Sequence, residues 1–320
     1  MSIASVTGEK AAAPPSAPPA KSRRQGRATL WVWLFLAPTI VLYGVFTVYP
    51  IIGSYWYSFL DWDGFTAQKT FVGLQNYRQV IDDPLFWGAF RHTLLFMVVT
   101  VPVQVFLSLL LAILLNSPKM PFSRIFRTAL FLPVVTTTAI VGVVMQSIFD
   151  PANGPVNLFI QKLGFSGGIN FLGSSSTSLW TGMAVYVWKW LGITLIYWLA
   201  ALQTVPKELY EAASIDGATA RGLFRYITLP LLKPFTIIIT LLSLEASLHV
   251  FDLVQTMTGG GPFYSSEVLE IYIYRWAFAA TIPRLGYASA AAVIFGLFVF
   301  VIGLFQLLGI RAARRSGMQS

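Results

Sequence analysis

The sequence predicts an all-α integral membrane protein with six transmembrane helices and both termini in the cytoplasm. Its composition, its long apolar stretches and the distribution of its basic residues lead to this prediction. Hydrophobic residues make up 56% of the chain and charged residues 11%, whereas about 25% of the residues in soluble domains are charged. Too few charges remain to cover a water-exposed surface, so the chain is expected to lie in a bilayer.

Six apolar stretches are long enough to cross a bilayer, which takes about 20 residues of helix. Inside lipid, backbone N–H and C=O groups have no partner outside their own segment, so each stretch is predicted to be helical. The predicted spans are residues 30–49, 94–115, 125–149, 179–202, 232–256 and 287–310.

Basic residues orient these spans. Most Lys and Arg residues outside the spans lie in the N-terminal segment, the second loop, the fourth loop and the C-terminal segment. Positive charge favours the cytoplasmic side, which places both termini there. This topology explains the net charge of +9, and no nucleic-acid partner is expected because the basic residues are not gathered on one folded face.

Composition and charge also divide the chain into three parts. Residues 1–28, rich in Ala and Pro before a basic cluster, are predicted to be a disordered cytoplasmic tail. A cleavable signal peptide is disfavoured because the apolar run begins late and is long enough to span. Residues 29–310 form the transmembrane domain, and residues 311–320 form a basic cytoplasmic tail.

The fourth loop, about residues 204–230, carries helix signals of its own. Pro206 suits a first helical turn, and Glu208 and Glu211 follow near the positive end of the helix dipole. Gly217 suits a left-handed helix stop. A second short helix is predicted over residues 218–226, and Pro230 is expected to interrupt the chain after it.

The spacing of residues in this loop matches a known pattern. Glu211-Ala212-Ala213, then Gly217, then an Ile-x-Leu-Pro sequence at residues 227–230 resembles the EAA loop of ABC importer permeases. The resemblance implies the transmembrane domain of a type I ABC importer, whose coupling helix docks in a groove of a cytoplasmic ATPase. An isolated tripeptide of this kind would be read as an ordinary charged loop. The residues assigned to ATPase coupling are Glu208, Glu211, Ala212, Ala213, Asp216, Gly217 and Arg221.

Two external segments resemble the carbohydrate-uptake branch of these permeases. Residues 71–77 and 82–87 are predicted to form an amphipathic interfacial helix, for which simple anchoring at the membrane surface is an equal alternative. Residues 258–262, Thr-Gly-Gly-Gly-Pro, are predicted to end a helix and turn the chain. They are not a nucleotide loop, because no Lys-Ser or Lys-Thr follows them.

The fifth span contains the candidate substrate site. Glu245, His249 and Asp252 are spaced four and three residues apart, so a continuous helix would present them on one face. Polar groups inside a membrane are costly against lipid, and they are expected to face the bundle interior or a watery cavity. His249 is alternatively a residue of helix packing.

The fourth span offers partners for that site. Lys189, Thr194 and Tyr197 lie in it together with Trp and other Tyr residues, a set that suits a sugar because aromatic rings cover C–H faces and polar groups bind hydroxyls. Alternatively, Lys189 neutralises Glu245 or Asp252, or meets a partner subunit. With two His and no Cys in the chain, metal binding is not expected.

The chain resembles the first permease subunits of maltose-type and glycerol-phosphate-type importers, and this resemblance implies the other subunits of the complex. Such a chain pairs with a second homologous permease, two ATP-binding cassette ATPases and an extracytoplasmic solute-binding protein in a bacterial cytoplasmic membrane. ATP and Mg²⁺ are used by the ATPases, so this chain is expected to bind no cofactor and to be no enzyme itself.

Charge narrows the expected substrate, and other classes of protein remain as alternatives. Two acids against one Lys at pathway depth favour a neutral oligosaccharide or polyol over a glycerol phosphate, which needs several Arg or Lys donors. An ion-coupled secondary transporter would also carry acids and His in the membrane, but needs no EAA loop. An intramembrane enzyme is disfavoured, because the sequence contains none of the hydrolase motifs.

Overall fold

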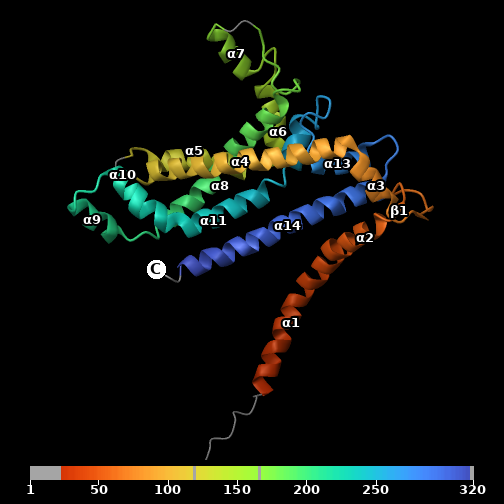
Figure 1. Ribbon diagram of the computed structural model, residues 1–320, viewed down its shortest axis with the longest axis horizontal. Coiled ribbons are helices and arrows are strands. Elements are labelled where there is room, and N and C mark those ends of the chain that lie inside the picture. Colours follow the sequence, from red (N-terminus) through yellow and green to blue (C-terminus); the bar gives the residue numbers. More distant parts are fainter. Residues whose placement is uncertain (1–22, 118–119, 165–166, 318–320) are drawn as a thin grey trace, which may run out of the picture. The chain divides into compact units, whose positions relative to one another are not determined.

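The computed structural model describes residues 23–117, 120–164 and 167–317. The described residues are mostly helical, with one antiparallel sheet of two short strands (Figure 1). The chain divides into two compact units, Met1–Gly53 and Ser54–Ser320. Most of the predicted tail, residues 1–22, lies outside the described residues, and the first helix begins at Arg23, inside the predicted tail.

The first unit contains the first predicted span. Helix α1 (Arg23–Tyr43) continues through a π-helical segment, η1 (Gly44–Val48), into α2 (Tyr49–Tyr57), which crosses into the second unit. The stretch Trp31–Tyr57 is long and apolar enough to cross a membrane. Large apolar side chains are exposed along it, as expected for a helix that faces lipid.

The second unit contains the bundle. It begins with β1 (Leu60–Asp61), β2 (Thr70–Phe71), α3 (Gln75–Asp82), α4 (Pro84–Asn116), α5 (Ser123–Val135), α6 (Thr138–Ile148) and α7 (Pro155–Lys162). It continues with α8 (Ser178–Leu202), α9 (Lys207–Ile215), α10 (Ala220–Leu223), the π-helical η2 (Phe224–Thr228), α11 (Leu229–Ala246), α12 (Phe251–Met257), α13 (Leu269–Tyr274), the π-helical η3 (Arg275–Ala279) and α14 (Leu285–Gly317).

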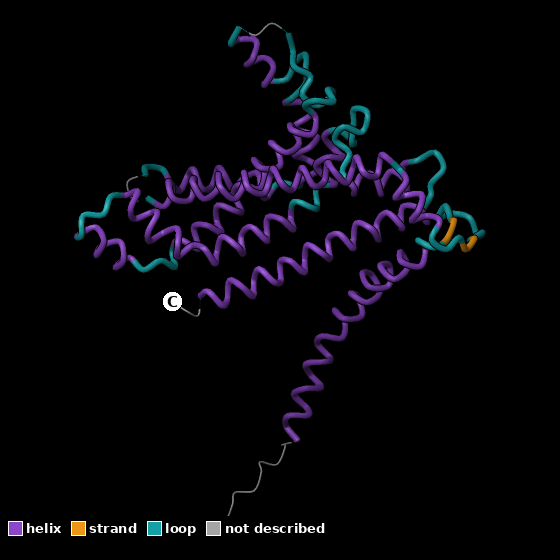
Figure 2. Tube along the Cα trace, viewed as in Figure 1, coloured by secondary structure: helices purple, strands orange, loops and turns teal. Residues whose placement is uncertain are grey.

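Helix α8 lies at the centre of this unit. It packs lengthwise against α4 and also contacts α5 and α11, while α14 packs on α11. Loops lie mainly at the ends of the long helices (Figure 2). Trp198 of α8 is fully buried, and its indole N–H donates to the Val105 carbonyl at 3.1 Å. The indole group is therefore satisfied inside the apolar core, as buried polar groups require.

The predicted set of six spans is confirmed in part. Among the described residues, five helices are long and apolar enough to span. Two match the predicted ranges closely, because α8 covers residues 179–202 and the apolar part of α14 is Leu285–Leu308. The cytoplasmic location of the termini remains a prediction.

The third predicted span is wrong as a single helix. Residues 125–149 form α5 and α6, which are bent by 103° at a break near Thr136. Pro133 lies in the last turn of α5 and supplies no N–H, and three successive Thr residues follow at positions 136–138. Proline and β-branched residues both disfavour continuation of the helix. Thr136 is extended, at ψ 139°, where the chain turns.

The fifth predicted span is also wrong as a continuous helix. Helix α11 ends at Ala246 and α12 begins at Phe251, so the helix is interrupted inside the predicted range of residues 232–256. At its other end the helix starts earlier than predicted. Pro230 does not interrupt the helix. The π-helical turn η2 ends two residues before it, and α10, η2 and α11 form one stretch from Ala220 to Ala246.

The predicted interfacial helix divides at Asp83. Helix α3 is amphipathic and ends at Asp82, whereas the residues from Pro84 onwards belong to α4, which is longer than the predicted second span. The Asp83 carboxylate caps α4 by accepting from the Leu85 amide at 2.9 Å. The predicted turn at residues 258–262 is confirmed: α12 ends at Met257, and Gly259 and Gly260 have positive φ.

Candidate functional site

Helix α9 carries the Glu-Ala-Ala part of the EAA pattern, and its C-terminal end is closed by local hydrogen bonds. At its C-terminus the Ala218 amide donates to the Ala213 carbonyl at 2.9 Å, and the Gly217 amide donates to Ser214 at 3.1 Å. These two bonds form a Schellman motif, which needs a left-handed residue. Gly217 supplies it at φ 81°. The predicted helix stop is confirmed.

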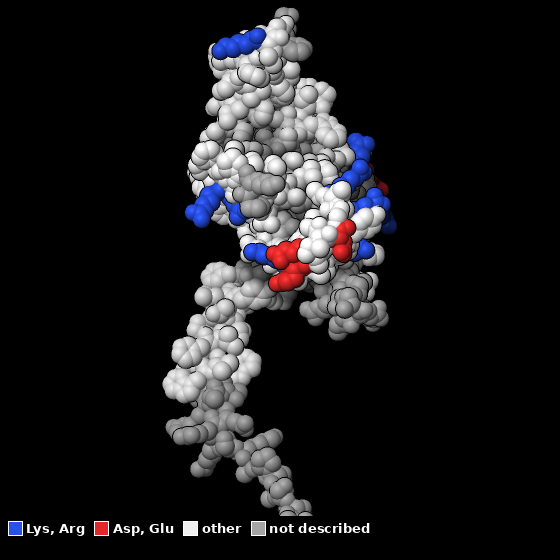
Figure 3. All heavy atoms as spheres, turned by 90° about the vertical axis from the view of Figure 1, so that its left-hand side faces the viewer, with Lys and Arg blue, Asp and Glu red and all other residues white. Residues whose placement is uncertain are grey.

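The residues predicted to couple to an ATPase lie mostly on the surface. Glu208, Glu211, Ala212 and Asp216 are exposed, and Ala213 is half-buried. Figure 3 looks onto the end of the molecule that carries α9: acidic side chains gather near the middle of this face, and basic side chains form separate groups to either side. An exposed helix with small Ala side chains and carboxylates can approach another protein closely.

Helix α9 is tied to the membrane-spanning part through one tyrosine. The Tyr210 hydroxyl lies 2.8 Å from the Thr228 hydroxyl, at the end of η2. Tyr210 and Thr228 also line a hollow of about 230 Å³ between α9 and the ends of α4 and α8. The hydrogen bond therefore connects α9 to the helix that continues as α11. Arg221 does not belong to α9; it lies on α10, where it is exposed.

Lys189 occupies a different place from the one predicted. Its side chain is fully buried, and its ammonium donates to the carbonyls of Thr136 at 2.7 Å and Pro133 at 3.1 Å. Among the described residues no carboxylate lies within ion-pair distance of it. Its pairing with Glu245 or Asp252, one of the predicted alternatives, is therefore wrong. Lys189 instead caps the C-terminal end of α5, where free carbonyls and the helix dipole favour a cation.

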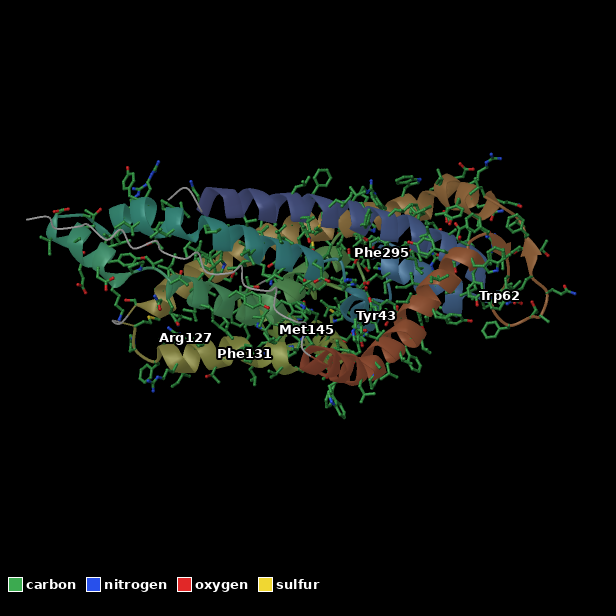
Figure 4. The ribbon with its side chains drawn as sticks, turned by 90° about the horizontal axis from the view of Figure 1, so that it is seen from below. Tyr43, Trp62, Arg127, Phe131, Met145 and Phe295 are labelled. Carbon is green, nitrogen blue, oxygen red and sulfur yellow. The ribbon has the colours of Figure 1, made fainter. Side chains whose placement is uncertain are left out.

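Figure 4 shows the two helices on either side of this break, with Arg127 and Phe131 along α5 and Met145 on α6. Met145 belongs to the apolar core cluster that also includes Tyr186. Arg127 donates to the Leu115 carbonyl at 2.6 Å, which binds α5 to the end of α4. The bent pair is therefore held on both sides of its corner.

Thr194 and Tyr197 separate in the structure. Thr194 is buried, accepts from the Gln104 amide at 2.7 Å and donates to the Trp190 carbonyl at 3.3 Å. Tyr197 is 38% exposed. Thr194 thus joins α8 to α4, and Tyr197 faces outward.

The break between α11 and α12 contains the acidic cluster. The His249 ring lies 3.5 Å from Glu245 and 3.2 Å from Glu270. The other Glu270 oxygen accepts from the amides of Val250 at 2.9 Å and Phe251 at 2.7 Å. Glu270 thus satisfies the free amides at the start of α12.

The prediction that the fifth span presents one continuous polar face is wrong, because the helix is broken here. Glu245 lies in the last turn of α11, His249 lies between the helices and Asp252 lies in the first turn of α12, so the three do not share the face of one helix. All three are nevertheless exposed. Glu270 was not found from the sequence, because it lies 21 residues from His249 and no local spacing connects them.

A second polar cluster anchors α13. The Tyr272 hydroxyl donates to the Asp83 carboxylate at 2.6 Å, and Tyr287 donates to the same oxygen at 3.0 Å. Arg275 pairs with the buried Glu267 at 2.7 Å. Burial raises the pKa of the Glu267 carboxyl, and the Arg275 guanidinium acts in the opposite direction. These bonds hold the segment after the glycine turn against α4 and α14.

The arrangement shows no candidate metal site within the described part of the chain. No group of three or more His, Asp or Glu residues there could hold a metal ion. What it does contain is an exposed helix with the EAA spacing, hydrogen-bonded to a candidate membrane span, and a bundle interrupted at two polar breaks.

Comparison with known proteins agrees with this architecture. Over residues 86–315 the chain matches the family described as the binding-protein-dependent transport system inner membrane component. The lactose transport system permease protein LacF of Rhizobium radiobacter is 35% identical over 284 residues, covering 87% of this chain and 93% of LacF. The arabinooligosaccharides permease protein AraP of Bacillus subtilis is 35% identical, covering 86% of this chain and 87% of AraP.

A solved structure shares the fold. A chain of a bacterial ABC transporter involved in the import of the acidic polysaccharide alginate superposes with a TM-score of 0.76 at 23% identity, covering 91% of this chain and 98% of that chain. The family match extends over most of the sequence, from the first turn of α4 to the last turn of α14. The chain is a multi-pass membrane permease and belongs to the family of binding-protein-dependent transport system inner membrane components.

Proposed function

We propose that the chain is one of two permease subunits of an ATP-driven sugar importer in a bacterial cytoplasmic membrane. Its partners are a second homologous permease, two ATP-binding cassette ATPases and an extracytoplasmic solute-binding protein. ATP and Mg²⁺ are bound and used by the ATPases, and this chain binds no cofactor of its own. The observation that carries the proposal is the exposed helix α9, which has the EAA spacing and is closed by the Gly217 turn.

Helix α9 serves as the coupling helix in this proposal. Glu208, Glu211 and Asp216 offer carboxylates to a basic groove, and Ala212 and Ala213 allow close approach. The Tyr210–Thr228 hydrogen bond then connects α9 to the stretch that continues as α11. Movement of the ATPases would reach the pathway through this connection. Arg221 lies next to this surface on α10.

The proposed cargo is a sugar, most consistent with a neutral oligosaccharide or polyol. Relatives are named as permeases for lactose, for arabinooligosaccharides and, in MsmF of Streptococcus mutans, for multiple sugars. The exposed ionisable groups near the α11–α12 break include Glu245 and Asp252, while Lys189 is buried among carbonyls. A glycerol phosphate, the alternative cargo, would need exposed cations at this depth.

The proposed pathway surface comprises Glu245, His249, Asp252 and Tyr197, all of which are exposed in this chain. A second permease would cover this surface and enclose the pathway. Lys189 and Thr194 are buried and bonded to α5 and α4 respectively. Their proposed role is to position the helices that form the pathway.

The proposal is tested by transport in proteoliposomes that contain the full chain with its co-purifying subunits and the solute-binding protein. Uptake of a labelled oligosaccharide is expected to require hydrolysable ATP on the side that carries α9. A non-hydrolysable ATP analogue provides the control. Uptake that proceeds without ATP and follows a proton gradient would instead support an ion-coupled secondary transporter.

A further inference from the structure

Three cations line one hollow at the start of the fifth span. The hollow has a volume of about 450 Å³ and is lined by Arg221, Phe224, Arg225, Leu229, Pro230 and Lys233. Arg221, Arg225 and Lys233 are all exposed. Within the described part of the chain, no carboxylate pairs with any of them, and none of their side chains makes a hydrogen bond. The hollow therefore has unbalanced positive charge.

The π-helical turn η2 brings the third cation onto the same side. In a regular α-helix, at about 100° per residue, Lys233 would lie about 120° around the axis from Arg221. A π-helical turn takes in one additional residue, which reduces this offset to about 20°. The turn is closed by the Leu229 amide, which donates to the Phe224 carbonyl. The π-helical segment before Pro230 thus places the three cations on one side of the helix, whereas a regular α-helix would place Lys233 on a different side.

The walls of the hollow between these charges are apolar. Phe224, Leu229 and Pro230 line it, and Leu229 and the neighbouring Leu231 are 40% and 41% exposed. The hollow lies in the first half of the candidate span Ala220–Ala246. At this end of a membrane-spanning helix we expect lipid headgroups, which would meet cations beside an apolar surface.

We propose that the hollow formed by Arg221, Arg225 and Lys233 binds the phosphate headgroup of an anionic phospholipid. The three cations complement the phosphate charge, and the apolar walls accommodate the glycerol and the first part of the acyl chains. Basic pockets at the membrane interface bind anionic headgroups on these physical grounds. A carboxylate of a neighbouring subunit is the competing occupant, and the apolar walls at span depth favour the lipid over it.

The test compares lipid retention between variants of the full chain, purified with its co-purifying subunits. The proteins are reconstituted in nanodiscs with equal amounts of phosphatidylglycerol and phosphatidylcholine, re-extracted in mild detergent, and analysed for bound lipid by mass spectrometry. The hollow variant carries Arg221→Gln, Arg225→Gln and Lys233→Gln. The matched control carries Arg78→Gln, Arg91→Gln and Lys162→Gln, three exposed cations on other elements. Elution profiles check that both variants are folded.

The unmodified protein is expected to retain phosphatidylglycerol in preference to phosphatidylcholine. Removing the three charges should reduce that retention about fivefold or more, whereas the control should leave it unchanged. Soluble glycerol phosphate at millimolar concentration should not displace the lipid, because it lacks the chains that meet the apolar walls.

Three results would overturn the inference. The first is equal retention of phosphatidylglycerol by the hollow variant and the unmodified protein. The second is full displacement by glycerol phosphate, which would identify a site for a soluble phosphate. The third is loss of a co-purifying subunit with lipid retention intact, which would identify a protein interface. None of these readouts depends on transport, so they are independent of the proposed function.

Discussion

The Lys189 ammonium donates to the main-chain carbonyl of Thr136 at 2.7 Å, and this bond joins the centre of α8 to the corner between α5 and α6. A second bond reaches the Pro133 carbonyl at 3.1 Å. The Pro133 carbonyl also accepts from the Thr136 amide at 3.3 Å, whereas the Thr136 carbonyl lies at the corner, where the two helices are bent by 103°. A cation buried at the middle of the bundle thus stabilises a corner instead of pairing with an acid.

Replacing Lys189 by Met should destabilise the protein by removing the ammonium donor from the Thr136 carbonyl, whereas the Pro133 carbonyl keeps the Thr136 amide as a donor. An unsatisfied carbonyl inside the protein costs about 1–3 kcal/mol, so the melting temperature, followed by Trp fluorescence in detergent, should fall by several degrees. Lys162→Met, an exposed position on α7, is the matched control. Equal melting temperatures for Lys189→Met and the unmodified protein would show that the corner does not depend on this bond.

Gly192 allows α5 and α8 to approach closely. A Cβ at this position would clash with the Leu130 carbonyl oxygen, whereas a Cβ at Gly182 of the same helix would meet nothing. Gly192→Ala should therefore lower the melting temperature and the yield of folded protein, since the clash involves backbone that cannot move aside. Gly182→Ala should be tolerated. Similar yields and melting temperatures for both variants would contradict this close approach.

Glu270 holds the start of α12 by accepting from two amides. Glu270→Ala should remove this cap at a cost of about 1–2 kcal/mol, and the Val250 and Phe251 amides should exchange hydrogen faster. Glu245→Ala, which removes a carboxylate that contacts His249 but no backbone amide, provides the control. Unchanged exchange in Glu270→Ala would exclude this capping role.

Docking of the ATPase should depend on the charge and the closing turn of α9. Glu211→Lys should reduce the amount of ATPase that co-purifies while membrane insertion stays intact, because the change reverses a charge on the docking surface. Asp82→Lys, an exposed acid at the end of α3, is the charge-matched control. Normal co-purification and uptake by Glu211→Lys would count against the docking role.

The turn at Gly217 can be tested separately. Gly217→Val places a β-branched residue at φ 81°, where such side chains are strained, and should disorder the end of α9 and reduce transport. Gly217→Asn should be tolerated better, since Asn adopts left-handed conformations more readily. Equal transport by the two variants would show that this backbone conformation is not required.

Removal of the exposed acids at the α11–α12 break should impair uptake. Glu245→Gln and Asp252→Asn preserve side-chain size while removing charge, so assembly and ATPase co-purification should be preserved as sugar transport decreases. Uptake of labelled oligosaccharide in proteoliposomes measures the effect. Normal uptake in both variants would assign the acids to structural or interface roles.

Composition and local spacing were sufficient for the class of the protein and for the short helix that carries the EAA spacing. The extent of α8, the apolar part of α14 and the Gly217 turn follow from features within one segment: apolar length, or a residue that alone tolerates a given φ. The EAA spacing likewise lies within one loop, and the family match agrees with it.

The two interrupted spans depended on contacts between distant segments. Residues 125–149 and 232–256 are both predominantly apolar, and hydropathy alone does not distinguish a straight helix from a bent one. The bends are stabilised by Lys189, more than 50 positions from Thr136 in the chain, and by Glu270, 21 positions from His249. A backbone group that is left free inside a membrane needs a hydrogen-bond partner. Packing decides which side chain becomes that partner, because the backbone group and the side chain have no fixed spacing in the sequence.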